Sequence, residues 1–378
     1  MTSQDRSGLV RAMLRFFELE ASSGIALLTA TVMAFVWANM NPGGYEGFFT
    51  PAARHFINDG LMTLFFFIVA LEIKRELVEG ELRDRRAALL PVLAAIGGML
   101  VPAALYLVIA PAGEAGRGWG IPVATDIAFA VGVLALLGHR VSSGTKLFLL
   151  SFAIADDIGA ILVIAVFYAR DISFPWIGVA LAGLVLVWFA LRADLRSLVW
   201  FVPLGLAVWF ATDRSGVHAT IAGVALGFLV PASSRHGESL APSSRLENAL
   251  APWTAHLVVP VFALANAGIV LRGETLAFPP LAWAVAVGLV AGKAIGIFSF
   301  TWLIVRTRLA DLPRGMSPGH LLGVALLGGV GFTVSLFVAG LAFEDAALFN
   351  DARLGIFAGS IVAAVLGYLL LRVASKGN

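Results

Sequence analysis

Long apolar stretches, separated by short polar connections, run through the whole of this 378-residue chain and constrain its fold more than any other feature. A helix needs about 20 apolar residues to cross the hydrocarbon core of a bilayer. Twelve stretches approach or reach that length, and we expect each of them to be a membrane-spanning helix. Their bounds are 16–39, 59–79, 87–109, 121–138, 146–169, 174–191, 198–212, 216–231, 252–271, 281–305, 320–343 and 352–373. Turn-forming residues such as Asn41 to Gly44 separate them and predict loops.

The composition argues against a soluble globular protein. Hydrophobic residues make up 59% of the chain, charged residues make up only 13%, and the mean hydropathy is +0.91. Soluble domains keep about a quarter of their residues charged. We therefore expect an all-α membrane protein that forms one domain over residues 1–378, with membrane lipid as its partner. The net charge of +2 and the absence of cysteine give no reason to expect nucleic acid, disulfides or a cofactor.

The placement of Lys and Arg predicts the orientation in the membrane, because inner loops carry an excess of both residues. If the N-terminus lies inside, 19 of the 26 Lys and Arg residues fall in inner segments and 6 in outer ones, and Lys293 lies within a span. We expect a bacterial inner-membrane protein with both termini in the cytoplasm. Apolar residues alternate with arginines over residues 9–17, which predicts a short helix lying on the membrane surface.

Two of the expected spans contain glycine and proline where a helix should continue. The fourth span begins with Gly118 to Pro122, and the eleventh contains Gly328 to Phe332 in its middle. Unwound backbone is tolerated at this depth only beside protein or a water-filled cavity. A pair of broken helices in matching places indicates an inverted-repeat transporter, with spans 3–5 and 10–12 as the repeats. The alternative is ordinary helix packing through small residues.

Asp156 and Asp157 are the most informative residues of the chain. Asp156 lies ten residues after Lys146, about 15 Å along a helix, which places it near the middle of the fifth span. A charge at that depth is costly and marks an ion or proton pathway, unless it only holds helices together. Neighbouring residues point about 100° apart on a helix, so one carboxylate can face a cavity and the other a neighbouring helix. Their mutual repulsion predicts that at least one holds a proton near neutral pH.

Three further residues of the spans carry polar chemistry. Asp126 and the adjacent Thr125 lie beside the break of the fourth span and offer oxygen ligands for a small cation, although the carboxylate could instead cap the broken helix end. Lys293, between Gly292 and Ala294, is the only basic residue deep in a span. An intramembrane lysine needs a partner, and one of the aspartates is the obvious one, unless the side chain reaches the membrane surface instead. The glycines around Lys293 allow another helix to come close.

A charged cluster lies at the inner end of the second span. Glu72, Arg75, Glu76 and Glu79 share one helical face, which predicts either a solvated helix end or a pH-responsive funnel. His218 lies near the start of the eighth span, and we expect it to pack there or cap the helix.

The motifs in combination are similar to those of the NhaA-type sodium/proton antiporters, and the similarity extends along nearly the whole chain. The matching segments are Leu71 to Leu77, Ala124 to Ala130, Ala155 to Ala160, Ser215 to Thr220, Phe262 to Gly268 and Gly331 to Thr333. The resemblance implies twelve helices in inverted repeats, with broken helices four and eleven crossing each other. It also implies an antiporter, not an enzyme, which exports cytoplasmic sodium or lithium in exchange for protons, moves net charge and responds to pH.

The resemblance further implies a role for individual residues. Asp157 would be the principal sodium ligand, and Asp156 would be the proton-carrying acid that pairs with Lys293. Asp126 and Thr125 would complete the site. The pH-response cluster would consist of Glu72, Arg75, Glu76 and Glu247.

Two departures from the family pattern bear on assembly and regulation. Residues 40–58 lack the alternating pattern of the hairpin that joins the best-known members into homodimers, which puts dimerisation in question. Asn248 and Ala251 occupy positions after Glu247 at which some members carry histidines, a difference that bears on the pH threshold.

Two other functions compete with antiport. A sodium-coupled organic anion symporter could use the same fold but would need a large polar cavity. An intramembrane aspartyl protease would use aspartates on two neighbouring spans, and those enzymes share a Gly-x-Gly-Asp motif that no aspartate of this chain has.

Overall fold

The computed structural model describes residues 3–193, 198–234, 240–270 and 278–375, and only the backbone of residues 3–21. All regular structure in these ranges is helical. The α-helices are α1 (Ser3–Met40), α2 (Pro42–Phe48), α3 (Pro51–His55), α4 (Met62–Val78), α5 (Arg85–Ile109), α6 (Ile127–Ala135), α7 (Ser143–Phe167), α8 (Phe174–Arg192), α9 (Leu198–Arg214), α10 (Thr220–Leu229), α11 (Pro242–Trp253), α12 (Val259–Asn266), α13 (Pro280–Val287), α14 (Lys293–Arg306), α15 (Pro318–Leu327), α16 (Phe332–Ala342) and α17 (Ala346–Ala374).

Shorter turns of helix join some of these elements. Three are 3-10 helical, namely η2 (Glu81–Arg83), η3 (Glu114–Val123) and η4 (Gly138–Arg140). Three are wider π-helical turns, namely η1 (Phe56–Leu61), η5 (Thr254–Val258) and η7 (Gly288–Gly292). Each π-helical turn continues directly into the α-helix that follows it, so α3 to α4, α11 to α12 and α13 to α14 form three long continuous helices.

The predicted all-helical membrane fold is confirmed. Eight helices among the described residues are long and apolar enough to cross a membrane, and two bent pairs, η3 with α6 and α15 with α16, add two broken spans. The pairs bend by 42° and 45° at the places where we predicted breaks in the fourth and eleventh spans. The predicted seventh and eighth spans are the shorter helices α9, of 17 residues, and α10, of 10 residues.

Three local expectations need correction. Helix α1 is continuous from Ser3 to Met40, so the helix predicted over residues 9–17 is not a separate element. The turn expected after Asn41 is the start of α2, because the Asn41 side chain accepts a hydrogen bond from the Gly44 amide and caps that helix. The ninth span begins at Pro242, ten residues before the expected start, because proline is well suited to the first turn of a helix.

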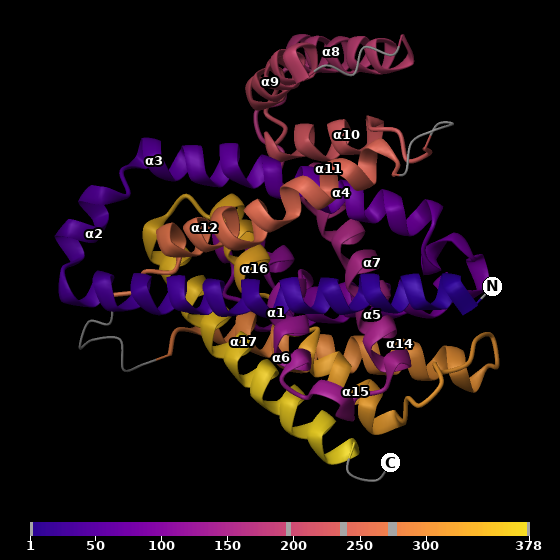
Figure 1. Ribbon diagram of the computed structural model, residues 1–378. Helices are drawn as coiled ribbons and strands as arrows, with labels where there is room; N and C mark the ends of the chain where they lie inside the picture. The colour runs from indigo at the N-terminus through magenta and orange to yellow at the C-terminus, as the bar shows by residue number, and fades with distance from the viewer. Residues whose placement is uncertain (1–2, 194–197, 235–239, 271–277, 376–378) are drawn as a thin grey trace.

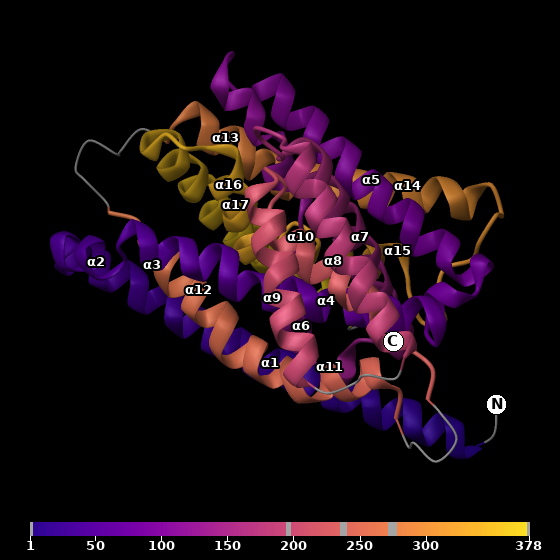
Figure 2. The same ribbon diagram turned by 90° about the horizontal axis from the view of Figure 1, so that it is seen from above.

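The spans form two groups, which Figures 1 and 2 show from two directions. One group contains α5 to α7 and α13 to α17, and the other contains α1 to α4 and α8 to α12. In the first group α5 and α14 lie side by side in both views and make the most extensive helix contact of the described residues. A Cβ atom on Gly97 or Gly296 would overlap the backbone of the other helix, so only glycine permits this approach.

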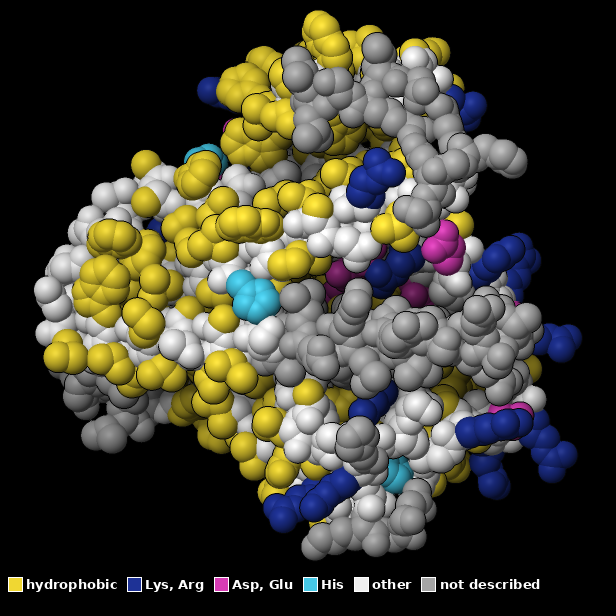
Figure 3. Space-filling view, in the orientation of Figure 1, with side chains coloured by type: hydrophobic (Ala, Val, Ile, Leu, Met, Phe, Trp, Pro, Cys, Tyr) yellow, Lys and Arg dark blue, Asp and Glu magenta, His cyan; other side chains and the backbone are white. Residues whose placement is uncertain are grey.

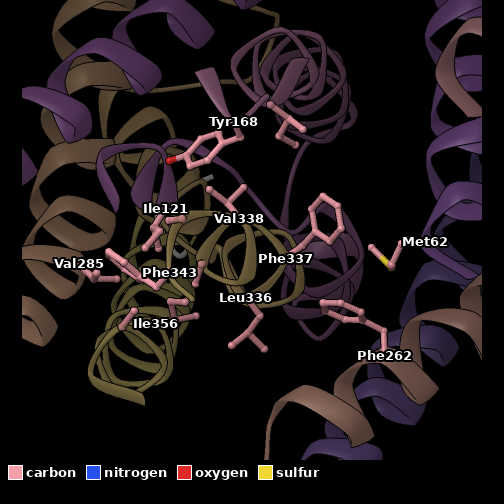
Figure 4. Packing of buried hydrophobic residues seen from close by; sticks show 14 of the residues in the cluster. Met62, Ile121, Tyr168, Phe262, Val285, Leu336, Phe337, Val338, Phe343 and Ile356 are labelled. Atoms are coloured by element: carbon pink, nitrogen blue, oxygen red, sulfur yellow. The ribbon is translucent and has the colours of Figure 1, made fainter. Parts of the chain in front are cut away.

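Aromatic side chains close the space between the two groups on the side away from the loops rich in Lys and Arg. Figure 4 shows Phe337 of α16 pointing toward Met62 of α4 and Phe262 of α12. The Phe337 ring centroid lies 5.2 Å from that of Phe66 and 6.3 Å from that of Phe262. All four side chains are buried, so no open path crosses this layer.

The outer surface carries large exposed hydrophobic side chains, many of them on α1, α8, α9 and α17. Figure 3 shows hydrophobic side chains over much of the visible face, while many of its Lys and Arg side chains gather toward the right-hand edge, near the end marked N in Figure 1. Such a surface suits a lipid environment with one polar border.

Candidate functional site

The two broken helices cross and are joined through their unwound backbones. The amide of Asp126 donates to the carbonyl of Val330 at 2.7 Å, and the Thr125 hydroxyl donates to the carbonyl of Gly328 at 2.7 Å. On the other side of the crossing, the Ser335 hydroxyl donates to the carbonyl of Ile121 at 2.7 Å. Polar backbone groups that the breaks would leave unpaired in the membrane therefore find partners in each other.

One carboxylate caps both half-helices that leave the crossing. Asp126 accepts a hydrogen bond at 3.0 Å from the amide of Phe129, in the first turn of α6. Its other oxygen accepts from the amide of Thr333 at 3.0 Å and from the Thr333 hydroxyl at 2.5 Å, in the first turn of α16. Capping was the alternative that we weighed for Asp126, and the structure shows that the residue caps two helices.

Asp156 and Lys293 form an ion pair in the interior. The Lys293 Nζ atom lies 2.8 Å from each carboxylate oxygen of Asp156, and both residues are 0% exposed. This geometry places Asp156 against a neighbouring helix, as the sequence predicted. It contradicts the alternative in which the lysine reaches the membrane surface.

The backbone before Lys293 is widened and closely packed. The π-helical turn η7 ends at Gly292, directly before Lys293, and such turns occur frequently at functional sites. A Cβ atom on Gly292 would lie 2.6 Å from the Cα atom of Pro102 in α5. The expected role of the glycine beside Lys293 is therefore confirmed, and α5 is the helix that comes close.

Asp157 points to a different place from Asp156. It is 9% exposed and lines a cavity of about 70 Å³ between the two groups of helices. Thr125, Asp126, Thr333 and Glu72 also line this cavity, so most of its polar atoms are oxygens. Asp156, Glu72 and Asp126 all act on Asp157 as like charges, and Lys293 offsets part of their effect, so this position attracts a cation.

The residues predicted to form a pH-response cluster lie in two neighbouring places. Glu72 belongs to the cavity of Asp157. Arg75 forms an ion pair with Glu247 that joins α4 to α11, and Glu76, whose carboxylate accepts a hydrogen bond at 2.9 Å from the amide of Glu81, is close enough to act on Glu247 electrostatically. Glu76 is buried and Glu79 is exposed, so the solvated helix end, which was one of our two readings, holds only in part.

His218 lies outside the crossing, next to the aromatic layer. Its Nε2 atom lies 3.1 Å from Asp59, its Nδ1 atom lies 3.1 Å from the Thr220 hydroxyl, and its ring packs against Phe337. Of the two roles that we expected for this histidine, packing is confirmed, whereas α10 begins without a side-chain cap.

Two residues that line the cavity were given no role from the sequence. Thr333 was part of a motif but received no role, although a hydroxyl residue beside a glycine-rich break resembles the Thr125 and Asp126 pair of the other break. Thr254, which lines the cavity from the π-helical turn η5, had no signal beyond its position in an apolar span.

Comparison with known proteins identifies the family. The profile of the Na+/H+ antiporter 1 family matches residues 14–371. Na(+)/H(+) antiporter NhaA 1 of Klebsiella pneumoniae is 45% identical over 383 residues, which cover 96% of each chain. Na(+)/H(+) antiporter NhaA of Escherichia coli O1:K1 and that of Citrobacter koseri are each 46% identical, over 95% of this chain and 97% of theirs. The chain therefore belongs to the NhaA family of Na+/H+ antiporters.

Proposed function

We propose that this transporter exchanges sodium or lithium for protons by letting both compete for Asp157, with Asp156 and Lys293 as the neighbouring pair that also changes protonation. The observation that carries the proposal is the difference between the surroundings of the two adjacent aspartates. Asp156 is neutralised by Lys293 in the interior, whereas Asp157 faces a cavity lined by oxygen atoms. Carboxylate and hydroxyl oxygens are the hard ligands that a small alkali cation prefers.

Competition explains coupling without a separate coupling element. A protonated Asp157 has lost the negative charge that sodium needs, and a deprotonated one at this depth in the membrane needs a cation nearby. The two loaded states can then be carried across as one helix group moves against the other. If Asp156 also releases its proton when sodium binds, the exchange moves net charge and responds to voltage.

The remaining ligands follow from the lining of the cavity. The Thr125 hydroxyl donates its proton to Gly328, so its oxygen lone pairs remain available to a cation. Asp126 already accepts three hydrogen bonds, so we assign it mainly to holding the crossing in place. The size of the cavity argues against an organic anion, since sites for such solutes usually have at least about 300 Å³.

The placement in the membrane follows from the charged loops. We infer that sodium leaves the cytoplasm across a bacterial inner membrane, with both termini on the cytoplasmic side. The cavity is lined by Glu72, near the end of α4 on the side expected to be inner, and by Ala251 of α11, a helix that follows an expected inner loop. A reporter that is active only in the periplasm, fused after Asn378, should stay silent, and strong activity would reverse the orientation.

The charged residues at the end of α4 are our candidates for regulation. We infer that Arg75, Glu247, Glu72 and Glu76 set the pH response, because the Arg75–Glu247 ion pair connects α4 and α11 beside the cavity that Glu72 lines. Glu247→Gln should therefore shift the pH profile of transport, and an unchanged profile would remove these residues from regulation.

A homodimer would have to form without a β-hairpin, since residues 42–55 make α2 and α3. Cross-linking in native membranes would test whether such a dimer exists.

The decisive experiment measures protons released when sodium is added to purified protein in weak buffer, over a series of pH values. Direct competition predicts proton release, and it predicts that sodium affinity weakens as the pH falls. Asp157→Asn should abolish both sodium binding and transport while leaving a folded protein. Sodium binding without proton release, at a pH where affinity still depends on pH, would exclude direct competition.

A further inference from the structure

A second hollow lies on the same side of the molecule as the loops rich in Lys and Arg, and the proposed mechanism does not use it. It has a volume of about 460 Å³ and lies between the first turns of α5, the first turns of α7 and the connection from α14 to α15. Charged side chains of Glu81, Arg86 and Asp311 line it, and it ends at Phe148 and Ser151 of α7. Water can therefore approach the interior here by a path separate from the cavity of Asp157.

Two aromatic rings lie between this hollow and the buried ion pair. Phe148 lines the hollow, and its ring is stacked on that of Phe152, with centroids 6.5 Å apart and an interplanar angle of 19°. On the far side, the Lys293 Nζ atom lies 5.8 Å from the centroid of the Phe152 ring. Both rings are buried, and Phe152 is 0% exposed.

The Phe152 ring is fixed from several sides. A Cβ atom on Gly98 of α5 would lie 3.5 Å from the ring, and one on Gly328 at the break of the second repeat would lie 3.2 Å from it. Backbone therefore surrounds the ring and leaves little space for it to turn aside. Its π-face is available to the Lys293 ammonium, and an aromatic face attracts a desolvated cation.

The ion pair is also absent from the lining of the first cavity, which reaches Asp157 but neither Asp156 nor Lys293. In this state the pair therefore contacts neither hollow directly. A phenylalanine ring offers no hydrogen-bonding atom that could relay a proton. A proton that crossed the rings would bypass Asp157, and the bypass would uncouple proton movement from sodium movement.

We propose that Phe152, supported by Phe148, is a positioning residue for Lys293 that holds the ammonium against Asp156 and seals the pair from the second inner hollow, so that protons reach the pair only past Asp157. The part that concerns protons rests on the proposed function. The part that concerns sealing and positioning rests on the geometry alone.

The coupling test uses proteoliposomes without sodium and measures how fast an imposed pH gradient decays. Phe148→Ala and Phe152→Ala should each speed the decay about tenfold, because each opens a space that water can enter. Leu149→Ala is the matched control, since Leu149 is equally buried on the same helix but does not line the hollow. A gradient as stable in both phenylalanine variants as in Leu149→Ala would show that no protons cross where the rings were removed, which would overturn the part of the proposal that concerns protons.

A second measurement does not depend on whether the pair carries protons. The chain has no cysteine, so Lys293→Cys provides a single thiol. A membrane-impermeant cationic thiosulfonate can label this thiol when it is added to the side of the membrane that the second hollow faces. Adding Phe148→Ala should raise the labelling rate about tenfold by admitting water, and adding Leu149→Ala should leave it unchanged. Rapid labelling with both rings present, or no increase in Phe148→Ala, would refute the seal.

The two measurements separate the failure of this inference from that of the proposed function. If labelling increases but the gradient stays stable, the seal exists and the proton role of Asp156 and Lys293 is wrong. If the gradient decays faster, adding Asp156→Asn should restore a slow decay, because the leak passes through the pair. A leak that persists in that double variant would place the proton path elsewhere and overturn the proposal.

Discussion

The two broken helices occupy matching positions in the two repeats, but they are held in different ways. Helix α6 begins with its own capping residue, since Asp126 accepts from the Phe129 amide. Helix α16 begins at Gly331, which has no capping side chain, and its Thr333 amide is served by Asp126 from the other break. The carboxylate that caps the second half-helix therefore comes from the first break, whereas the second break supplies no side chain that caps the first half-helix.

This asymmetry shows that two repeats can have the same shape and still contribute different chemical groups. The first break supplies an acid and the Thr125 hydroxyl, whereas the second supplies no acid but the Thr333 hydroxyl, glycines and the carbonyl groups of Gly328 and Val330. Glycine lets the second break lie directly against the first and against α13 to α14. A cation site at such a crossing gains its charge from one repeat and its close packing from the other.

Removing the shared cap should have the largest effect. Asp126→Ala deletes three hydrogen bonds to a carboxylate and uncaps both half-helices, so we expect a loss of about 3 kcal/mol in the free energy of unfolding. Asp126→Asn keeps one acceptor oxygen and should lose less. The measurement is thermal unfolding of the purified protein in detergent. Equal stability of Asp126→Ala and the parent chain would show that the crossing does not need this carboxylate.

Adding a methyl group at the second break should have an intermediate effect. In Gly329→Ala the new Cβ atom would lie 3.0 Å from the Leu326 carbonyl oxygen and would overlap that of Leu289, and backbone atoms have little freedom to move away. We expect a loss of about 2 kcal/mol, typical of overpacking. Gly340→Ala in the same half of the span is the control, because its nearest atom is 4.0 Å away. If the two variants unfold at the same temperature, the second break is looser than described.

Removing one hydroxyl should have the smallest effect on stability, and this effect should be confined to α16. Thr333→Val deletes the hydroxyl bond to Asp126 but keeps the amide bond, at a cost of about 1 kcal/mol. Because α16 depends on the shared cap, hydrogen–deuterium exchange should become faster in residues 332–342. Exchange in residues 127–135 of α6 should stay as in the parent chain. Faster exchange in both segments would mean that the dependence is mutual.

The sequence predicted the features that follow from membrane physics. Apolar length located the spans, glycine and proline located both breaks, and the cost of a buried charge predicted the pairing of Lys293 with an aspartate. The 100° between neighbouring residues predicted that Asp156 and Asp157 would face different environments.

Features that depend on the relative placement of distant segments were not predictable in the same way. The double cap of Asp126 requires residues 126 and 333 to meet, and helix periodicity does not give that distance. The short helices α2 and α3 lie where turn-forming residues predicted a loop, because Asn41 and the prolines also serve as helix starts. The stack of Phe148 on Phe152 has the i, i+4 spacing of many ordinary apolar helix faces, so only the structure connects it with Lys293.

The direction of the Lys293 side chain depends on the widened turn that precedes it. A π-helical turn holds one residue more than the α-helical path it replaces. A chain lacking one residue between Gly288 and Gly292 could therefore form an unbroken α-helix in which the parts before and after the deletion keep nearly the same orientation. If all the residues were kept but formed an α-helix without the widened turn, every residue after it would be rotated by about 100° relative to α13. With α13 held in its present contacts, the ammonium of Lys293 would then point away from Asp156, so the widened turn directs Lys293 at its partner.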